Sequence, residues 1–556
     1  MPRPSVTFLC RIAFVVMAAL IWPRTPAAAQ TTPRYDICVY GGTSAGVIAA
    51  VQARKMGRSV ILVSPTKHLG GLTSGGLGFA DLGDINTVGG LSRDFFHRVW
   101  QYYQKPEAWK FQAKEQFKGA GQGNPAFNQE LEVASIVEPH VAENIYNSLI
   151  VENKIEVIQA RLDLRNGVKK IGPRITAIRM ENGRIVTAAV FIDATYEGDL
   201  MAKAGVSYTV GREANAQYHE QANGIQAGKL GNQLPKGIDP YVKKGDPSSG
   251  LLPRVNPNAG GANGDADKKI QAYCYRMCLT AVPENRIPIA KPAGYKEEDY
   301  ELLFRAIEAG QKDRFFKFSS LPNRKTDSNN DSGISTDYIG MNYDYPEADY
   351  TTRQKIEDAH KNWQLGLIWT LQNSPRVPES IRNQFAKWGL PKDEFTDSGN
   401  WSPQLYIREA RRMVNDHVAS EDTLKKHVTD ESVGMGSYKM DSHNVQYCVD
   451  PNGFVSAEGD VQTGTGGPYE IDYRTMVPRA PECENLIVPV CLAATHIAYG
   501  SIRMESVFMI LGQSAATAAA LAVDENLPVQ KIDYSKLKTR LQTDGQILEK
   551  SSAQKS

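Results

Sequence analysis

The chain has 556 residues, which exceeds the roughly 250–300 residues at which a single hydrophobic core stops growing. Hydrophobic residues make up 41% of it and charged residues 22%, so the composition is globular and excludes a wholly disordered protein. The 63 Lys and Arg residues balance 62 Asp and Glu residues, so nothing in the net charge indicates nucleic acid or an anionic membrane as a partner.

The first thirty residues have the layout of a secretory signal peptide. Arg3 and Arg11 flank an apolar run from Ile12 to Trp22, which is too short to span a bilayer of about 30 Å. Small residues follow and end at Ala29, where we expect cleavage. A short membrane anchor is the alternative. We therefore expect a periplasmic or secreted protein with no membrane span in the mature chain.

Six cysteines remain after that cleavage, and an oxidising compartment permits them to pair. The sequence does not select a pairing, although Cys38 lies in an apolar strand pattern and is expected to be a buried free thiol. Cys274 and Cys278 are too few for a zinc site. The polar loop at 327–333 departs from the calcium-loop spacing, so we expect no metal.

The first predicted elements are a buried strand at 35–40, a tight turn at 41–46, a helix from Val47 to Met56 and a second strand at 59–63. Two parallel strands joined by a helix imply a right-handed crossover and a doubly wound sheet. The remaining expected elements are helices over 90–103 and 138–151, strands over 155–159, 174–179 and 184–192, loops over 211–265, helices within 295–430, a strand over 486–490 and a long helix over 504–523.

The turn at 41–46 resembles the dinucleotide-binding pattern GxGxxG, with Thr43 in place of the second glycine. In that pattern the glycines permit the tight turn, the approach of a pyrophosphate and close helix packing, while the helix N-terminus faces the phosphate. We expect the hydroxyls of Thr43 and Ser44 near that phosphate. The second strand ends in Ser64 and reaches Lys67 without the usual acidic residue, so the turn alone leaves FAD, NAD and NADP open.

Three segments, at 65–78, 191–205 and 496–520, follow the turn in an order that resembles the FAD-dependent oxidoreductases of the glutathione reductase/fumarate reductase superfamily. More narrowly, the chain resembles the secreted bacterial FAD-dependent oxidoreductases that are often loosely labelled "xanthan lyase". The segments that extend this resemblance through the middle of the chain are 271–280, 335–350, 405–413 and 436–446.

The resemblance implies an α/β protein in which a doubly wound, Rossmann-like FAD-binding domain carries an inserted α+β substrate or cap domain. The expected parts are a signal peptide at 1–29, the FAD-binding domain at 34–210 and 471–545, the cap at 211–470 and a disordered tail at 546–556.

The resemblance also implies which residues bind FAD. The long final helix is expected to direct its N-terminus at the flavin, where its dipole stabilises negative charge. Tyr196 replaces a glycine that such enzymes usually carry. His68 is considered for covalent flavin attachment, but is out of step with the known arrangement. The implied cofactor-binding residues are Gly41, Gly42, Thr43, Ser44, Ala45, Gly46, Ser64, Pro65, His68, Gly70, Gly71, Leu72, Thr73, Ser74, Gly75, Gly76, Ala194, Thr195, Arg503, Met504 and Glu505.

Flavin chemistry also needs a group that handles a proton, and His443 and His496 are the candidates, each of which could instead be structural. Arg408 and Arg412 lie four residues apart on a predicted helix, where they could clamp an anionic or polyhydroxylated substrate or form salt bridges.

The sequence thus predicts an FAD-dependent oxidoreductase that oxidises a small polar substrate, either a sugar derivative or a hydroxy acid, by hydride transfer to flavin N5. The electron acceptor is not identified by any motif. A non-redox lyase or polysaccharide-binding protein, and an NADP-linked reductase favoured by Ser64 and Lys67, are the alternatives.

Overall fold

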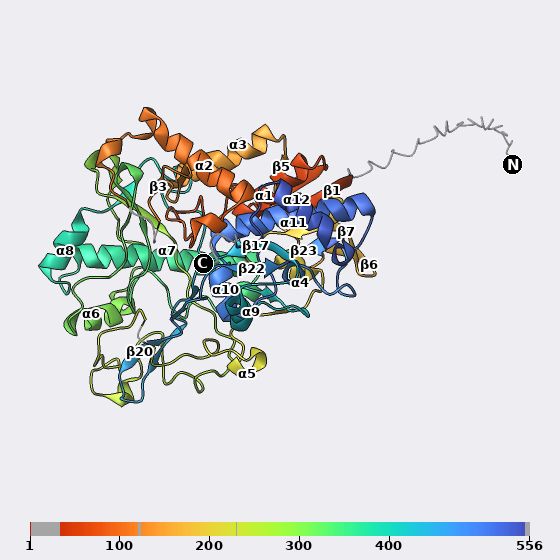
Figure 1. Ribbon diagram of the computed structural model, residues 1–556. Coiled ribbons are helices and arrows are strands. Elements are labelled where there is room, and N and C mark those ends of the chain that lie inside the picture. The colour runs from red at the N-terminus through yellow and green to blue at the C-terminus, as the bar shows by residue number, and fades with distance from the viewer. Residues whose placement is uncertain (2–33, 120–123, 230, 551–556) are drawn as a thin grey trace.

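A seven-stranded sheet forms the centre of one half of the molecule in the computed structural model (Figure 1), which describes Met1 and residues 34–119, 124–229 and 231–550. The predicted signal peptide lies outside the described residues. The strand order is β5-β2-β1-β8-β7-β6, with β23 also paired to β8. The strands are β1 (Arg34–Tyr40), β2 (Val60–Ser64), β5 (Glu156–Gln159), β6 (Val168–Ile171), β7 (Arg174–Arg179), β8 (Ile185–Asp193) and β23 (Leu486–Ile487).

Five of these strands run parallel, because β1 pairs with β2 and β8, β2 pairs with β5 and β23 pairs with β8 in the same direction, whereas β7 is antiparallel to both β6 and β8. Tyr40, the last residue of β1, lies opposite Val63 and Asp193. The carboxyl ends of β1, β2 and β8 therefore meet at one edge of the sheet, which is where ligands bind in open parallel sheets.

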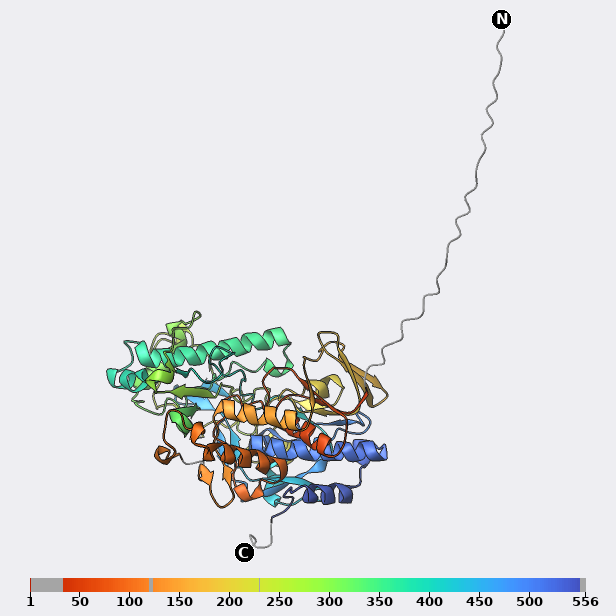
Figure 2. The same ribbon diagram turned by 90° about the horizontal axis from the view of Figure 1, so that it is seen from above.

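Two helices contact β1 from outside the sheet, α1 (Ser44–Lys55) and α11 (Glu505–Glu525), and they pack against each other. A Cβ atom built on Gly512 would lie 2.3 Å from the Ala45 carbonyl oxygen, so only glycine permits this close approach. Figure 2 shows α11 beside α1, with α2 (Gly90–Gln104), α3 (Pro139–Glu152) and α12 (Tyr534–Thr543) alongside. The glycine in the middle of α11 thus serves helix packing.

By length and composition helix α11 could span a membrane, although the sequence predicts no membrane span in the mature chain. Helix α11 has 21 residues and a mean hydropathy of 1.7 over its most apolar window, but 89% of that window is buried inside the protein. Its apolar character follows from its position between α1 and the rest of the core, since a helix that is apolar all round is a core helix or a membrane span.

The second half of the molecule combines the long helix α7 (Tyr350–Asn373) with short helices and small sheets (Figure 1). Strand β17 (Ser432–Gly436) lies within the predicted cap and nevertheless packs on α11. The other elements here are α6 (Glu301–Glu308), α8 (Glu379–Ala386), α9 (Glu421–Lys426), β10 (Val255–Asn256), β11 (Met277–Thr280), β12 (Arg286–Ile287), β13 (Ser319–Leu321), β14 (Lys325–Ser328), β15 (Leu390–Pro391), β18 (Met440–Ser442), β19 (Gln446–Val449), β20 (Val455–Glu458), β21 (Val461–Thr463) and β22 (Tyr469–Asp472).

The remaining short helices and strands are β3 (Phe127–Asn128), β4 (Val133–Ala134), α4 (Asp199–Lys203), β9 (Tyr208–Thr209), α5 (Asn215–Tyr218), β16 (Arg412–Met413) and α10 (His496–Ile502). The helix predicted around 405–413 is wrong, because this segment is extended and pairs with Tyr208 and Thr209 through β16. The predicted disordered tail starts too early, since Gln546 and Leu548 are buried.

All six cysteines among the described residues are buried and unpaired. The prediction for Cys38 is confirmed, and burial raises the pKa of its thiol. No disulfide therefore contributes to this part of the structure.

Candidate functional site

The turn after β1 has glycine where the backbone leaves no room for a side chain. Gly41 has φ +118°, and a Cβ on it would lie 2.6 Å from the carbonyl carbon of Ala194. A Cβ on Gly46 would lie 1.8 Å from the Gly41 oxygen, and one on Gly42 would lie 2.4 Å from Ser64 Oγ. The tight turn, the strand end at Ser64 and the end of β8 are thus in direct contact, as the dinucleotide pattern requires.

Thr43, which replaces the second glycine, does not point its hydroxyl at a phosphate. Its Oγ1 donates a hydrogen bond to the Ala194 carbonyl at 2.6 Å and accepts one from the Gly46 N–H at 3.2 Å. Thr43 is therefore the N-cap of α1. The N–H groups of Ser44 and Ala45 begin the helix and have no partner one turn back, so the turn keeps two backbone donors for an anion.

Glu505, the first residue of α11, joins the three glycine-containing segments. Its Oε2 accepts hydrogen bonds from Ser44 Oγ at 2.6 Å and Thr73 Oγ1 at 3.0 Å, and its Oε1 accepts one from Tyr196 OH at 2.7 Å. Burial raises the pKa of Glu505, although each of these three hydrogen bonds acts to lower it. The last helix thus begins beside the opening turn, which is the arrangement that the sequence predicts. Met504 precedes it as the N-cap.

The glycine-rich loop at 70–76 packs between the two halves of the molecule. Gly70, Gly71 and Gly76 have positive φ angles, and a Cβ on Gly76 would lie 2.3 Å from the Arg276 carbonyl oxygen. Tyr196 lies over Gly71, where a Cβ would meet its hydroxyl at 2.3 Å, and that hydroxyl accepts the Leu72 N–H at 2.9 Å. The side chain of Tyr196 therefore occupies space beside Gly71 that would be open if position 196 were glycine, as it usually is in the enzymes that the sequence resembles.

Several other residues predicted at the cofactor use their hydroxyl groups for hydrogen bonds within the protein. Thr195 Oγ1 donates to Asp193 at 2.7 Å, Ser74 Oγ donates to the Leu69 carbonyl at 2.6 Å, and the side chain of Gln404 blocks the space beside Gly75. Ser64 Oγ donates to the Thr66 carbonyl at 2.5 Å, and Pro65 is partly buried next to it.

His68 points at carboxylates. Its Nδ1 lies 2.8 Å from Glu143 Oε1 and its Nε2 lies 3.6 Å from Asp397 Oδ1. The neighbouring Lys67 pairs with the same Asp397 at 2.7 Å. Lys67, which the sequence offers in favour of an NADP-linked reductase, is thus already paired at the surface.

His443 lies between two carboxylates in a second, polar cluster. Its Nδ1 is 2.8 Å from Asp337 Oδ2, and its Nε2 is 3.6 Å from Asp441 Oδ2. Arg408 pairs with Asp337 at 2.9 Å and Arg503 pairs with Asp441 at 3.2 Å. Burial alone would raise the pKa of both carboxyls, but His443 and the arginines outweigh it and lower the pKa of each. The carboxylates therefore stay ionised and orient the imidazole.

The ring of Tyr406 lies among three buried arginines, with the guanidinium carbons of Arg408, Arg503 and Arg276 at 4.5, 5.7 and 5.9 Å from its centre. Arg503 also donates to its hydroxyl at 2.6 Å. Asp81 belongs to the same cluster. Burial and the charges of Asp441 and Asp327 raise its pKa to about 6, although the charges of Arg276 and Arg503 act to lower it.

Sequence reasoning missed Asp81, Arg276, Asp337, Tyr406 and Asp441. A signal was nevertheless present, because each of the four middle segments that carry the family resemblance contributes to this cluster, and Asp81 follows the segment at 65–78 by three residues.

His496 and Arg412 belong to a different and fully enclosed network. His496 Nδ1 is 2.7 Å from Glu409 Oε2 and its Nε2 is 3.1 Å from Ser442 Oγ. Arg412 pairs with Glu409 at 2.9 Å and with Glu213 at 2.7 Å. The predicted clamp of Arg408 and Arg412 is wrong, since the segment is not helical and the two guanidiniums face different carboxylates. The enclosure and the pairing of His496 and Arg412 favour the structural alternative for both residues.

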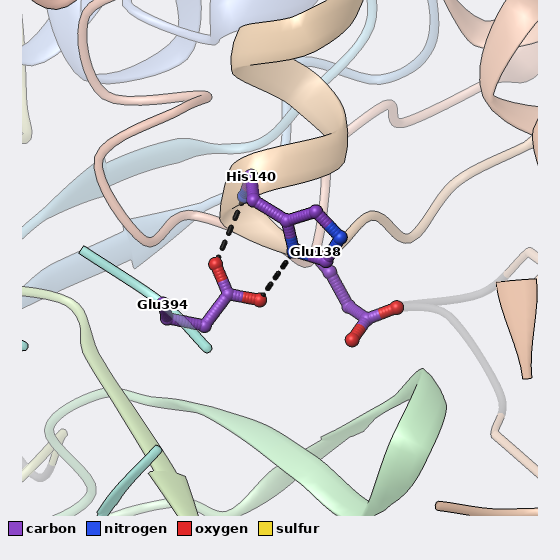
Figure 3. A group of neighbouring side chains, drawn as sticks. All are labelled: Glu138, His140 and Glu394. Atoms are coloured by element: carbon purple, nitrogen blue, oxygen red, sulfur yellow. Dashed lines mark hydrogen bonds and ion pairs between the residues drawn. The ribbon is translucent and has the colours of Figure 1, made fainter. Parts of the chain in front are cut away.

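A group of potential metal ligands, Glu138, His140 and Glu394, lies at the start of α3 (Figure 3). His140 Nδ1 is 2.7 Å from Glu394 Oε1. The ammonium group of Lys325 already lies among the carboxylates, 2.9 Å from Glu138 Oε1 and 2.6 Å from Glu394 Oε1. A buried lysine thus provides the positive charge that a metal would otherwise supply.

Comparison with known proteins identifies the family of the chain. Residues 36–541 match the sequence profile described as FAD dependent oxidoreductase. No curated protein matches the chain.

Solved structures that align in part include OxyS anhydrotetracycline hydroxylase from Streptomyces rimosus (14% identity, 33% of this chain and 36% of that chain, TM-score 0.22). Others are a flavin-containing monooxygenase from Stenotrophomonas maltophilia (16%, 33% and 43%, 0.18) and THI4 from Thermovibrio ammonificans (17%, 32% and 66%, 0.21). The chain thus spans well under half the length of the first two. At such TM-scores these likenesses carry no argument, and the assignment depends on the family profile.

Proposed function

Because the chain belongs to the FAD dependent oxidoreductase family and is therefore an α/β enzyme that uses FAD, we propose that it oxidises a small polar substrate, a sugar derivative or a hydroxy acid, at the cluster around His443. The observation that carries this proposal is the chain of contacts from Glu505 to His443. Glu505 contacts the opening turn, Arg503 lies two residues before it, and Arg503 pairs with Asp441 beside His443.

The described residues fit an FAD. In this proposal the turn at 41–46 holds the diphosphate with its free backbone N–H groups, and Ser64 and Pro65 lie by the adenosine ribose. The loop at 70–76 and the start of α11 then hold the flavin. The three glycines support this assignment, because a Cβ at Gly41, Gly42 or Gly46 would collide with neighbouring protein atoms and open the tight turn that a diphosphate-binding loop needs.

We place these residues in a doubly wound FAD-binding domain at 34–210 and 471–545, with 211–470 as the substrate cap. The parallel order of β5, β2, β1 and β8 supports the first domain, and the cluster of Arg276, Asp337, Tyr406 and His443 comes from the second. We also propose export through the segment at 1–29, and an electron acceptor outside the chain.

When bound, FAD supplies a flavin N5 that accepts a hydride from the carbon being oxidised. The protein handles the hydroxyl proton. A proton on His443 Nδ1 donates to Asp337, which leaves the Nε2 lone pair to accept the substrate proton. The resulting imidazolium lies between the carboxylates of Asp337 and Asp441, which stabilise its charge. Buried carboxylates with lowered pKa remain ionised throughout this step.

An anaerobic titration tests the proposal. Purified holoenzyme is mixed with neutral sugars and, separately, with hydroxy acids while the flavin absorbance is followed. We expect one class to bleach the flavin. His443→Gln should slow bleaching by about 10²–10⁴-fold, whereas His97→Gln, on the partly exposed surface of α2, should match the wild type.

Absence of bleaching by every compound, with unsaturated sugar products formed instead, would favour a lyase and overturn the proposal. Equal rates for His443→Gln and His97→Gln would remove His443 from the mechanism.

A further inference from the structure

A polar pocket of about 850 Å³ opens beside β21. Amide side chains of Gln221, Asn232, Gln233 and Gln462 line it together with the hydroxyls of Ser332 and Thr463. Its volume is in the upper part of the range of roughly 300–1,000 Å³ that small-molecule sites occupy. Among the described residues that line it there is no aromatic ring, so it offers hydrogen bonds rather than a stacking surface.

The charges in this wall cancel. Three cationic side chains and three carboxylates line the pocket. Arg314 pairs with Asp331 at 3.0 Å and Lys425 pairs with Glu421 at 2.5 Å. A wall whose formal charges sum to zero, and in which two of the three cations are paired, gives an ion little net attraction. Its amides and hydroxyls offer many donors and acceptors to a neutral ligand with hydroxyl groups.

Asp460 connects the pocket to His443. It is buried, lines the pocket and accepts a hydrogen bond from Asn232 at 2.6 Å. The next residue, Val461, is opposite Ser442 in the pairing of β21 with β18, and Ser442 directly precedes His443. Burial raises the pKa of Asp460, and the charge of His443 opposes that shift. The part of the pocket lining formed by Asp460 and Val461 is therefore a neighbour of His443.

The charges in the cluster around Tyr406 and His443 are balanced as well. Arg276, Arg408 and Arg503 each have their own aspartate, with N–O distances of 2.5 Å to Asp327, 2.9 Å to Asp337 and 3.2 Å to Asp441. No guanidinium in this cluster lacks a carboxylate partner. A carboxylate substrate would have to compete for these arginines, because an anion is held best by an unpaired one.

We infer that the pocket at Asp460 binds a neutral saccharide and leads one of its hydroxyl-bearing carbons to His443. This inference depends on the proposed oxidation for its catalytic part, and it selects the sugar over the hydroxy acid as the substrate class. The pocket is the saccharide subsite, and the cluster around Tyr406 and His443 is the reacting end.

Isothermal titration calorimetry tests the pocket independently of redox chemistry. The probes are cellotriose and maltotriose as neutral saccharides and trigalacturonate as the anionic comparator, each added to the oxidised holoenzyme. Thr463→Trp narrows the pocket and Gln462→Ala removes one of its amides. Thr539→Trp, on the exposed face of α12, is the matched control. Melting temperature and bound flavin confirm that each variant is folded.

We expect at least one neutral trisaccharide to bind saturably, with binding weakened about tenfold or more by Thr463→Trp and Gln462→Ala and unchanged by Thr539→Trp. No binding of either neutral probe, preferential binding of trigalacturonate, or equal binding to all variants would overturn the inference.

The two proposals fail differently. A saccharide that binds at the pocket without bleaching the flavin would retain the pocket and remove the oxidation. Bleaching by a sugar that is insensitive to Thr463→Trp would retain the oxidation and remove the pocket.

Discussion

The protein contains two networks of the same composition, each an arginine, a carboxylate and a histidine, whose arginines are only four residues apart. Arg408, Asp337 and His443 form one, and Arg412, Glu409 and His496 form the other. In both, Nδ1 of the histidine faces the carboxylate at 2.7–2.8 Å.

The networks differ at the second ring nitrogen. His496 Nε2 is 3.1 Å from Ser442 Oγ, and its side chain is 2% exposed. His443 Nε2 faces only the longer 3.6 Å contact with Asp441, and its side chain is 10% exposed. A histidine becomes available for proton transfer when one nitrogen is oriented by a carboxylate and the other is left unbonded. The partner of the second nitrogen, rather than the presence of the triad, separates the two roles.

The most direct test of the different roles of His443 and His496 is to make the same substitution in both networks. We expect His443→Gln to slow substrate-driven flavin reduction by about 10²–10⁴-fold with little change in stability. We expect His496→Gln to lower the free energy of unfolding by about 1–3 kcal/mol and to leave the reduction rate within a few-fold. Stopped-flow absorbance and denaturant titration measure the two quantities. Equal kinetic losses in both variants would remove the distinction.

Arg412→Ala tests how much the enclosed network contributes to stability. The substitution leaves Glu409 and Glu213 buried without their cation, so we expect the free energy of unfolding to fall by about 3–5 kcal/mol. Arg184→Ala is the control, because its ion pair with Glu156 is half exposed, and it should cost less than about 1 kcal/mol. Denaturant unfolding at a fixed FAD concentration compares them, and similar losses would contradict the structural role of Arg412.

The sequence could predict the elements whose signals are local. The strand, turn and helix at 35–56 and the long helix at 504–523 follow from apolar runs and glycine positions, and both agree with β1, α1 and α11 within a few residues. The position of Glu505 beside the opening turn could be predicted only from the family resemblance. No local signal places it there, because Ser44 and Glu505, which form the hydrogen bond, are 461 residues apart in the sequence.

The segment at 405–413 shows why the rest could not be predicted. Its residues have helical spacing, but Arg408, Glu409 and Arg412 obtain their partners from Asp337, His496 and Glu213. Such buried long-range ion pairs override local propensity, and nothing in the sequence states which carboxylate each arginine meets. The same limit hid Tyr406, whose role depends on three arginines from separate segments.

The free energy of unfolding should depend on pH in the acid range because of the enclosed network of Arg412, Glu409 and His496. His496 and Arg412 outweigh the effect of burial and lower the pKa of Glu409 to about 2, from an ordinary value near 4.3. A lowered folded-state pKa stabilises the protein above the unfolded pKa, and this contribution is lost as the pH falls from about 4.5 to 2, by roughly 3 kcal/mol in all.

Glu409→Gln removes that titration. We expect the variant to be less stable than the wild type at pH 7 and to depend less on pH below 4.5, so that the two curves converge towards pH 2. Chemical denaturation across this range measures both slopes. Parallel curves would show that other carboxyls cause the acid sensitivity.

The smallest expected effect comes from Ser442→Ala, which removes the partner of His496 Nε2 and makes the enclosed histidine resemble His443. Leaving a buried nitrogen without its hydrogen bond should cost about 1–3 kcal/mol of unfolding free energy. It should not alter flavin reduction. In a His443→Gln background it should not restore flavin reduction, because His496 is almost fully buried and pairs with Glu409 rather than with the cluster around Asp441. Denaturant titration and stopped-flow bleaching of the single and double variants decide this. Restored bleaching in the double variant would mean that a free second nitrogen is sufficient for activity, and that the location of His443 beside Asp441 and the pocket at Asp460 is not required.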